Sequence, residues 1–271
     1  MDEQASQHYL ERIGAQRPTA STHEALRDLH AHHQLAVPFE NLSIHLGEPI
    51  SLGEESLFEK IVLRRRGGFC YELNGAFARL LSALGFPVSY LAAGVFGEGG
   101  AVSPLFDHMV LGVWAGGPWL ADVGFGDHSL YPLRMDDPGP QLDPHGTFQV
   151  SRTPEGDLDI LRDGKPQYRV ETRPRRLEDF GPACWWQQTS ATSHFTRSLV
   201  CTLPVDGGRG RVTLSGRRLV RTMAGERDET VLGSDGDVLA AYRDLFGIHL
   251  DRVPQPAEAS TKLVTLHQPI P

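Results

Sequence analysis

The residues best suited to chemistry lie in the stretch 64–74, which reads RRRGGFCYELN. It places Cys70 where a run of arginines and a glycine pair meet the expected first turn of a helix. A thiol at a helix start lies near the positive end of the helix dipole and near free backbone N–H groups. Both favour the thiolate, the nucleophilic form of cysteine. Gly67 and Gly68 add no side-chain bulk, so backbone and substrate can approach the sulfur. We therefore expect Cys70 to be a nucleophile.

The other two cysteines, Cys184 and Cys201, have the pattern of buried side chains. Three cysteines without CxxC spacing argue against a disulfide framework and against a structural zinc site. Cys201 lies in an apolar, strand-like run, and Cys184 precedes a pair of tryptophans. We expect both to be packed in the core.

A nucleophilic cysteine needs a base, and the base needs a group that orients it. His108 opens an apolar strand, and Asp122 lies near the end of the next strand. If the two strands form a hairpin around residues 115–117, positions 108 and 122 lie close to directly opposite each other. Opposed side chains on one sheet face are about 5 Å apart. The sequence therefore predicts a His108–Asp122 pair, with a helix supplying the thiol and a sheet supplying the base.

A second polar group, His30, His32 and His33, lies on one expected helix, with His23 just before it. His30 and His33 share a face at spacing i, i+3, which would allow a shared metal ion. No cysteine or glutamate ligand accompanies them at the spacing of a known site. We expect surface or core histidines and no metal.

The elements that must position these residues begin with helices. Residues 6–85 read mostly helical: Thr22 can cap a helix that ends before Pro38. A further helix runs through 57–62, and another runs from Cys70 to Gly85, because its apolar residues recur at helical spacing.

The pattern then changes to strands and finally to a mixture. Strands are expected at 87–91, 107–114 and 118–123 and, beyond a Pro/Gly/Asp-rich loop at 136–146, at 147–150, 158–161 and 168–171. One helix is expected at 182–195, followed by strands at 199–203, 211–214 and 219–222, a helix at 235–246 and an extended Pro-rich tail after 251. This order indicates the α+β class.

Length and charge narrow the functional classes. A chain of 271 residues is long enough for roughly two domains and a well-buried core. A formal net charge of −8 disfavours broad binding to nucleic acid or to an anionic membrane surface. The N-terminus lacks a charged-then-apolar signal pattern, and Arg79, Gly85 and Pro87 interrupt the longest apolar stretch. We expect a cytoplasmic protein.

Four segments together resemble the arylamine N-acetyltransferases over nearly the full length of the chain. They are VPFENL at 37–42, RGGFC at 66–70 with ELN at 72–74, DHM at 107–109 and DVGFG at 122–126. The resemblance implies an α+β fold with a cysteine-protease-like (transglutaminase-like) core. Its parts would be a helical domain at 1–85 that carries the nucleophile, a β-barrel domain at 86–182 that carries His and Asp, and an interdomain helix with an α/β lid at 183–271.

The resemblance also implies roles for single residues. Cys70 would accept the acetyl group, His108 would act as its base and Asp122 would orient the base. Glu40 and Arg66 match an ion pair that buttresses the cysteine helix. The remaining matches are Phe39, Val95 and Phe125 in the acceptor pocket and Val102, Ser103, Pro104, Gly124 and Gly126 near coenzyme A, which is expected in an open cleft between barrel and lid.

The expected function is acetyl-CoA-dependent N-acetyl transfer onto arylamines, arylhydrazines or hydrazides, by a ping-pong route through a Cys70 thioester. Acetyl-CoA would be the cosubstrate, with no metal. An amide synthase that closes a macrolactam from a carrier-bound polyketide would keep the same triad, so the motifs leave that alternative open. A cysteine hydrolase and a non-catalytic binding protein are further alternatives. Intact Cys70, His108 and Asp122 count against the last.

Overall fold

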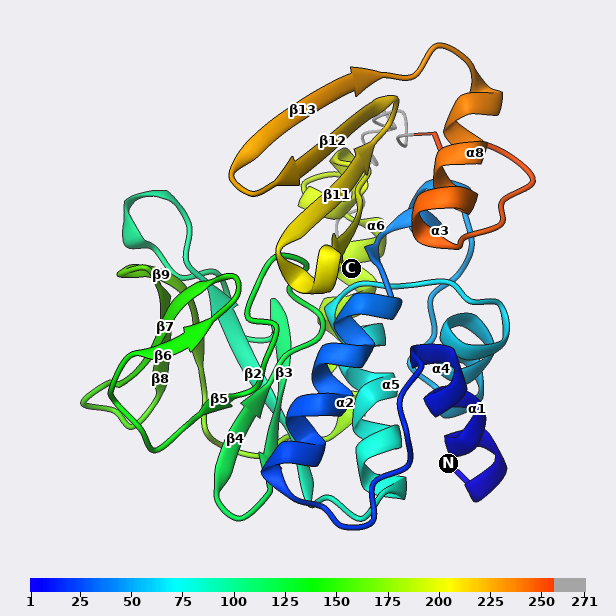
Figure 1. Cartoon of the computed structure of the whole chain (residues 1–271). Coiled ribbons are helices and arrows are strands. Elements are labelled where there is room, and N and C mark those ends of the chain that lie inside the picture. Colours follow the sequence, from blue (N-terminus) through cyan, green and yellow to red (C-terminus); the bar gives the residue numbers. More distant parts are fainter. Residues whose placement is uncertain (256–271) are drawn as a thin grey trace, which may run out of the picture.

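The N-terminal part of the chain is helical, as the sequence predicted (Figure 1, blue to cyan). The structure is a computed structural model and describes residues 1–255. Side-chain oxygens of Asp2 and Thr22 cap the first two helices by accepting the N–H groups of Ala5 and Ala25 at 2.8 and 3.3 Å. The elements are α1 (Glu3–Ile13), α2 (His23–Ala36), α3 (Leu42–Leu46), α4 (Glu54–Phe58), a π-helical turn (Glu59–Leu63) and α5 (Cys70–Ala83).

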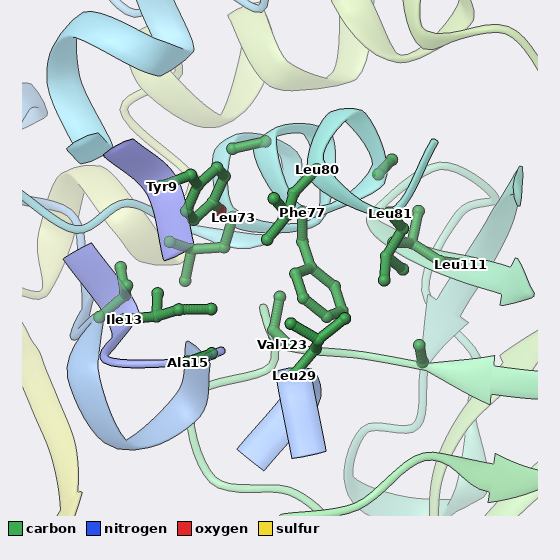
Figure 2. Packing of buried hydrophobic residues seen from close by; sticks show 14 of the residues in the cluster. Tyr9, Ile13, Ala15, Leu29, Leu73, Phe77, Leu80, Leu81, Leu111 and Val123 are labelled. Atoms are coloured by element: carbon green, nitrogen blue, oxygen red, sulfur yellow. The ribbon is translucent and has the colours of Figure 1, made fainter. Parts of the chain in front are cut away.

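Helix α5 lies at the centre of a large apolar cluster (Figure 2). Helices α1 and α2 and strand β3 (His108–Trp114) contribute to this cluster. Each fully buried large apolar side chain stabilises the fold by about 1.5–3 kcal/mol. Packing against these three elements fixes α5, and with it the position of its first residue, Cys70. The side chains that meet there include Phe77, Leu80 and Leu81 of α5, Tyr9 and Ile13 of α1, Leu29 of α2 and Leu111 of β3.

Within residues 1–255, eight antiparallel strands form a sheet that curls into a nearly closed barrel (Figure 1, mostly green). The order is β5-β4-β3-β2-β9-β8-β7-β6. The side chain of Gln141 joins the two outer strands, accepting the N–H of Arg134 at 2.7 Å and donating to its carbonyl at 2.9 Å. The other strands are β2 (Val88–Val95), β4 (Pro118–Ala121), β5 (Leu133–Arg134), β6 (Gln141–Asp143), β7 (Gly146–Arg152), β8 (Leu158–Arg162) and β9 (Lys165–Val170).

The β3–β4 hairpin forms, but in a different register from the predicted one. Trp114 lies opposite Pro118 and Leu111 opposite Ala121, so the hairpin is centred on residue 116. Directly opposed positions 108 and 122 would require a centre at residue 115. Continued along the strands, this register places position 110 opposite Asp122. His108 and Asp122 are then diagonal neighbours on one face, within reach of long side chains. The turn consists of residues 115–117, as predicted, with Ala115 N–H donating to the Gly117 carbonyl at 3.0 Å. A turn of these three residues is centred on 116, so positions 108 and 122 cannot lie directly opposite each other.

A second sheet joins the N-terminal part to the C-terminal part. Strand β1 (Phe39–Glu40) pairs antiparallel with β10, and within residues 1–255 the sheet has five strands in the order β1-β10-β11-β12-β13. Helix α8 packs its apolar face on this sheet. The remaining elements are β10 (Cys201–Val205), β11 (Gly210–Ser215), β12 (Arg218–Met223), β13 (Glu226–Val231) and α8 (Asp235–Phe246). The fold is therefore α+β, with helices, a barrel and an α/β lid, as predicted.

The single helix predicted at 182–195 is wrong. The chain forms α6 (Gly181–Thr189) and α7 (His194–Arg197), with a break between them. Ser190 has extended backbone angles, and Ser193 Oγ accepts the N–H of Phe195 at 3.1 Å to cap the second helix. Serine and threonine side chains compete for backbone hydrogen bonds, which favours helix ends over continuation.

Four strands of the described residues were not predicted: the two-residue strands β1 and β5, and also β6 and β13. The loop expected at 136–146 contains β6, and β13 was not predicted at all. Strand β13 has the sequence ERDETV and all six of its side chains are exposed, so it shows no apolar alternation. Backbone pairing with β12 makes it a strand. The predicted extended tail lies mostly outside the described residues, and the domain limits at 85 and 182 stay predictions.

Candidate active site

A cavity of about 900 Å³ opens where the helices, the barrel and the lid meet. Val102 is not one of the residues that line it; its backbone pairs with Phe96 in an isolated bridge. Glu40, Arg66 and Asp122 are buried behind the wall. Nine of the residues singled out in the sequence line the cavity: Phe39, Cys70, Val95, Ser103, Pro104, His108, Gly124, Phe125 and Gly126.

Cys70 is the first residue of α5. Phe69 before it has extended backbone angles, and Glu72 Oε2 accepts the Phe69 N–H at 3.3 Å, so the helix begins at the cysteine. Cys70 is only 3 % exposed. Gly124 packs directly on it: a Cβ at position 124 would lie 2.7 Å from the Cys70 Cα.

The glycine pair before Cys70 has a different use from the expected one. A Cβ at Gly67 would lie 1.9 Å from the carbonyl oxygen of Pro38, and a Cβ at Gly68 would meet the side chain of Glu72. Neither glycine lines the cavity. The pair allows close packing behind the site, and Gly124 is the glycine that leaves room beside Cys70.

The ionisation of Cys70 also differs from the expectation. Burial raises the pKa of its thiol well above the ordinary value, the negative charge of Asp122 adds to this, and a backbone hydrogen bond with Met109 lowers the pKa only in part. The helix start alone therefore does not produce a thiolate. A thiolate at Cys70 would require proton transfer to a neighbouring base.

His108 begins strand β3, and its Nε2 lies 2.8 Å from Asp122 Oδ2. Both side chains are buried. The rings of Phe125 and Tyr168 pack against the imidazole, with centroids 5.1 and 5.0 Å from its own, and restrict the orientation of the ring. Because Nε2 is engaged by the carboxylate, Nδ1 is the nitrogen left for proton exchange.

Asp122 follows the last residue of β4 and is held as a carboxylate. Its Oδ1 accepts from Asn74 Nδ2 at 2.9 Å and from the Gly124 N–H at 3.0 Å. Burial alone raises the pKa of Asp122, but the charge and hydrogen bond of His108, the charge of His128 and the hydrogen bond of Asn74 outweigh it, so the pKa lies below the ordinary value. An ionised Asp122 can fix the orientation of His108 and stabilise its cation.

Sequence reasoning missed three side chains around Asp122. Asn74 belongs to the ELN segment at 72–74, for which the sequence indicated no separate role. It reaches from α5 to Asp122, and its Oδ1 accepts the Val123 N–H at 3.0 Å. His30 and Gln34 of α2 contact the Asp122 backbone. The histidine cluster was a visible signal for His30, but a single sequence does not show what the helix faces.

Glu40 and Arg66 form a buried ion pair behind the cavity. Arg66 Nε lies 3.0 Å from Glu40 Oε1, and its Nη1 lies 3.1 Å from Glu48 Oε2. Glu40 Oε2 also accepts the Leu42 N–H at 2.6 Å. The pair joins β1 to the segment that leads into Cys70.

Cys184 and Cys201 are buried free thiols, as expected. Among residues 1–255, no group of three or more His, Cys, Asp or Glu side chains is arranged to hold a metal ion. His33 Nε2 instead lies 2.9 Å from the Tyr9 hydroxyl, and His32 Nδ1 lies 3.1 Å from the Ile13 carbonyl. Over the same described range, no helix has both the length and the apolar character to cross a membrane.

A family model described as N-acetyltransferase matches residues 22–254. The chain is 35 % identical over 257 residues to the arylamine N-acetyltransferase of Mycolicibacterium smegmatis, with 89 % of this chain and 91 % of that protein covered. It is 32 % identical over 253 residues to the arylamine N-acetyltransferase of Escherichia coli, with 90 % and 89 % covered.

Solved structures agree with these sequence matches. The arylamine N-acetyltransferase of Salmonella typhimurium superposes with a TM-score of 0.85 at 28 % identity, covering 96 % of each chain. The arylamine N-acetyltransferase of Mycobacterium marinum, solved in complex with CoA, superposes with a TM-score of 0.79 at 33 % identity, covering 89 % of this chain and 92 % of that one.

Proposed function

The chain belongs to the arylamine N-acetyltransferase family, and we propose that it moves an acetyl group from acetyl-CoA to an aromatic amine, hydrazine or hydrazide through a thioester on Cys70. The observation that carries this proposal is the placement of Cys70 and His108 in the wall of one cavity, with His108 held by Asp122 at 2.8 Å. The cysteine nucleophile, its base and the group that orients the base are the parts that covalent acyl transfer requires.

In the first half-reaction, Cys70 gives its proton to Nδ1 of His108, and the thiolate attacks the thioester carbonyl of acetyl-CoA. Asp122 stabilises the imidazolium and does not itself take the proton. When the tetrahedral intermediate collapses, the C–S bond to coenzyme A breaks, and the departing thiolate takes the proton from His108. The acetyl group is then bound to Cys70. Because burial raises the pKa of the Cys70 thiol, this transfer depends on His108 as the acceptor.

In the second half-reaction, the amine nitrogen attacks the acetyl carbonyl on Cys70, and His108 accepts the proton that the nitrogen loses. The Cys70 thiolate leaves and recovers that proton, which returns the enzyme to its starting state. Arylamines suit this step because they are weakly basic, so that they are uncharged at neutral pH and keep a free lone pair. The Cys70 N–H is a candidate donor to the oxyanion in both steps.

The cavity can take the donor and the acceptor in turn. Phe39, Val95 and Phe125 line it and would pack against an aromatic acceptor. Ser103, Pro104, Gly124 and Gly126 line the side proposed for coenzyme A, whereas Val102 is outside the wall. The homologue from Mycobacterium marinum was solved with CoA, which supports acetyl-CoA as the cosubstrate here.

The decisive experiment mixes the protein with acetyl-CoA in the absence of amine and follows the intact mass. One added acetyl group on the wild type, absent from Cys70→Ser, and its loss on addition of an arylamine or hydrazine would agree with the proposal. The matched control is Cys184→Ser, which should take up and release the acetyl group as the wild type does.

Two outcomes would contradict the proposal. An unmodified wild-type protein with unchanged acetyl-CoA would exclude acetyl transfer from this donor. Steady release of coenzyme A without amine would indicate a hydrolase, because water would then be the acceptor.

A further inference from the structure

The backbone of Asp122 lies just beyond the sheet that carries the rest of the hairpin. Strand β4 ends at Ala121, which pairs with Leu111. His108, Asn74 and the Gly124 N–H hold the carboxylate of Asp122. Its backbone N–H and C=O need other partners, because a buried backbone group without one is costly. Helix α2 supplies both.

His30, fully buried on α2, contacts the Asp122 backbone N–H. That N–H donates to His30 Nε2 at 3.1 Å, and His30 Nδ1 lies 2.8 Å from the carbonyl oxygen of Leu130. A carbonyl only accepts, so Nδ1 must carry the proton, and Nε2 must be free of one to accept from Asp122. The two backbone groups therefore select a single neutral tautomer of His30. Burial, the largest influence, lowers the pKa of His30, in agreement with a neutral ring.

Gln34 lies one turn further along the same face of α2. Its Nε2 donates to the carbonyl oxygen of Ser129 at 2.6 Å and, over a longer 3.4 Å, to the carbonyl oxygen of Asp122. The same helix therefore contacts the N–H and the C=O of one residue. The segment from Asp122 to Leu130, which includes Phe125 and Gly126 of the cavity wall, is anchored at both ends.

We propose that His30 and Gln34 are positioning residues for acyl transfer: from helix α2 they clamp the backbone of Asp122, and so set where its carboxylate holds His108 beside Cys70. This inference rests on the proposed function of Cys70, His108 and Asp122. It assigns a role to one member of the histidine cluster that forms no metal site within the described residues.

Two substitutions separate the contacts of His30. In His30→Asn the amide nitrogen occupies nearly the place of Nδ1 and still donates to Leu130, but the side chain is too short to accept from Asp122. In His30→Gln the amide oxygen occupies nearly the place of Nε2 and still accepts from Asp122. His33→Asn is the matched control, because His33 is a buried histidine of the same helix that contacts Tyr9 and not the site.

The first readout is the single-turnover rate of Cys70 acetylation by acetyl-CoA. His30→Asn is expected to lower this rate about 10- to 100-fold, since small displacements of a catalytic group cost that much. His30→Gln should stay close to wild type, and so should His33→Asn once the rate is corrected for the folded fraction. Equal rates for His30→Asn and His33→Asn would overturn the proposal.

The second readout needs no acetyl-CoA: the rate of Cys70 alkylation by iodoacetamide as a function of pH. If the clamp sets the His108–Asp122 pair, His30→Asn should shift this profile to higher pH, and His30→Gln and His33→Asn should not. An unchanged profile in His30→Asn would overturn the clamp even if wild-type acetylation is normal. If the profile of His30→Asn is shifted but the wild-type protein takes up no acetyl group, the clamp is retained and the acetyl-transfer function is rejected.

Discussion

Two cavities flank helix α6, and each has a buried cysteine and an exposed tryptophan in its wall. The cavity of about 900 Å³ contains Cys70 and Trp186, and the other, of about 680 Å³, contains Cys184 and Trp185. Both cysteines are buried free thiols. The two cavities differ in what surrounds the sulfur. Cys70 begins a helix and shares its cavity with His108, whereas Cys184 lies inside α6, and Gln188 Nε2 donates to its sulfur at 3.3 Å.

The acidity of the thiols does not distinguish Cys70, the proposed nucleophile, from Cys184. Burial raises the pKa of Cys184 to about 12 and raises that of Cys70 as well. An amide such as Gln188 cannot take the thiol proton, but an imidazole held by a carboxylate can. If Cys70 is the nucleophile, as proposed, its reactivity therefore depends on the neighbouring base.

Iodoacetamide at neutral pH should alkylate Cys70 and leave Cys184 unmodified, with a rate ratio of about 10³ or more, because only a thiolate attacks. Peptide mapping by mass spectrometry after timed quenching gives both rates on one sample. Faster labelling of Cys184 in the folded protein would reverse the assignment of the two cavities. Denatured protein is the control, since both cysteines should then react alike.

Asp122→Asn should lower the acetylation rate of Cys70 about 10³- to 10⁴-fold, as loss of the carboxylate does in serine-protease triads. An amide no longer fixes the tautomer of His108 or stabilises its cation. Pre-steady-state mass spectrometry measures the rate, and circular dichroism measures the folded fraction. A loss of rate that only follows the loss of folded protein would remove Asp122 from the mechanism.

The His108–Asp122 pair should also affect how the free energy of unfolding depends on pH. The pKa of Asp122 is below its ordinary value in the folded protein. The stabilisation from its pair with His108 is therefore complete above the pKa of an unfolded aspartate, about 4. It is lost as the pH falls toward the folded value. Urea unfolding at a series of acidic pH values should show a smaller loss of stability in Asp122→Asn than in wild type.

Arg66 links the walls of the two cavities through its two carboxylate partners. Glu40 follows Phe39, which lines the cavity with Cys70, and Glu48 lines the cavity with Cys184. Arg66→Met should destabilise the fold by about 3–5 kcal/mol, because it leaves a buried carboxylate unpaired. The control Arg64→Met removes a half-exposed pair with Glu48 and should cost about 1 kcal/mol or less. Chemical denaturation gives both values. Similar losses for the two variants would contradict a special role for the buried pair.

The two tryptophans of α6 give the smallest expected difference. Trp186 lines the cavity with Cys70 and is 43 % exposed, and Trp185 lines the other cavity and is 64 % exposed. Trp186→Ala should raise the KM for an aromatic acceptor about two- to tenfold, the loss expected for one aromatic contact. Trp185→Ala should leave that KM unchanged. A larger effect from Trp185 would indicate that substrate also uses the second cavity.

The sequence alone determined the local structure around Cys70 and the residue types of the proposed triad. The start of α5 at Cys70, the cap at Thr22 and the α8 helix at 235–246 follow from signals within a few residues, such as apolar periodicity and turn residues. The His108–Asp122 pair followed from the same kind of reasoning, although the hairpin register was off. The resemblance of four segments to a known family implied roles for Glu40, for Arg66 and for residues lining the cavity, and these roles stay predictions.

Only the tertiary structure decided what surrounds these residues. His30 and Asp122 are 92 positions apart, and no local pattern shows that the backbone N–H of Asp122 donates to His30. The raised pKa of Cys70 and the packing of Gly124 on it likewise depend on elements brought together by folding. Helix propensity, caps and turns act over a few residues, whereas burial, electrostatics and long-range hydrogen bonds depend on which elements pack together.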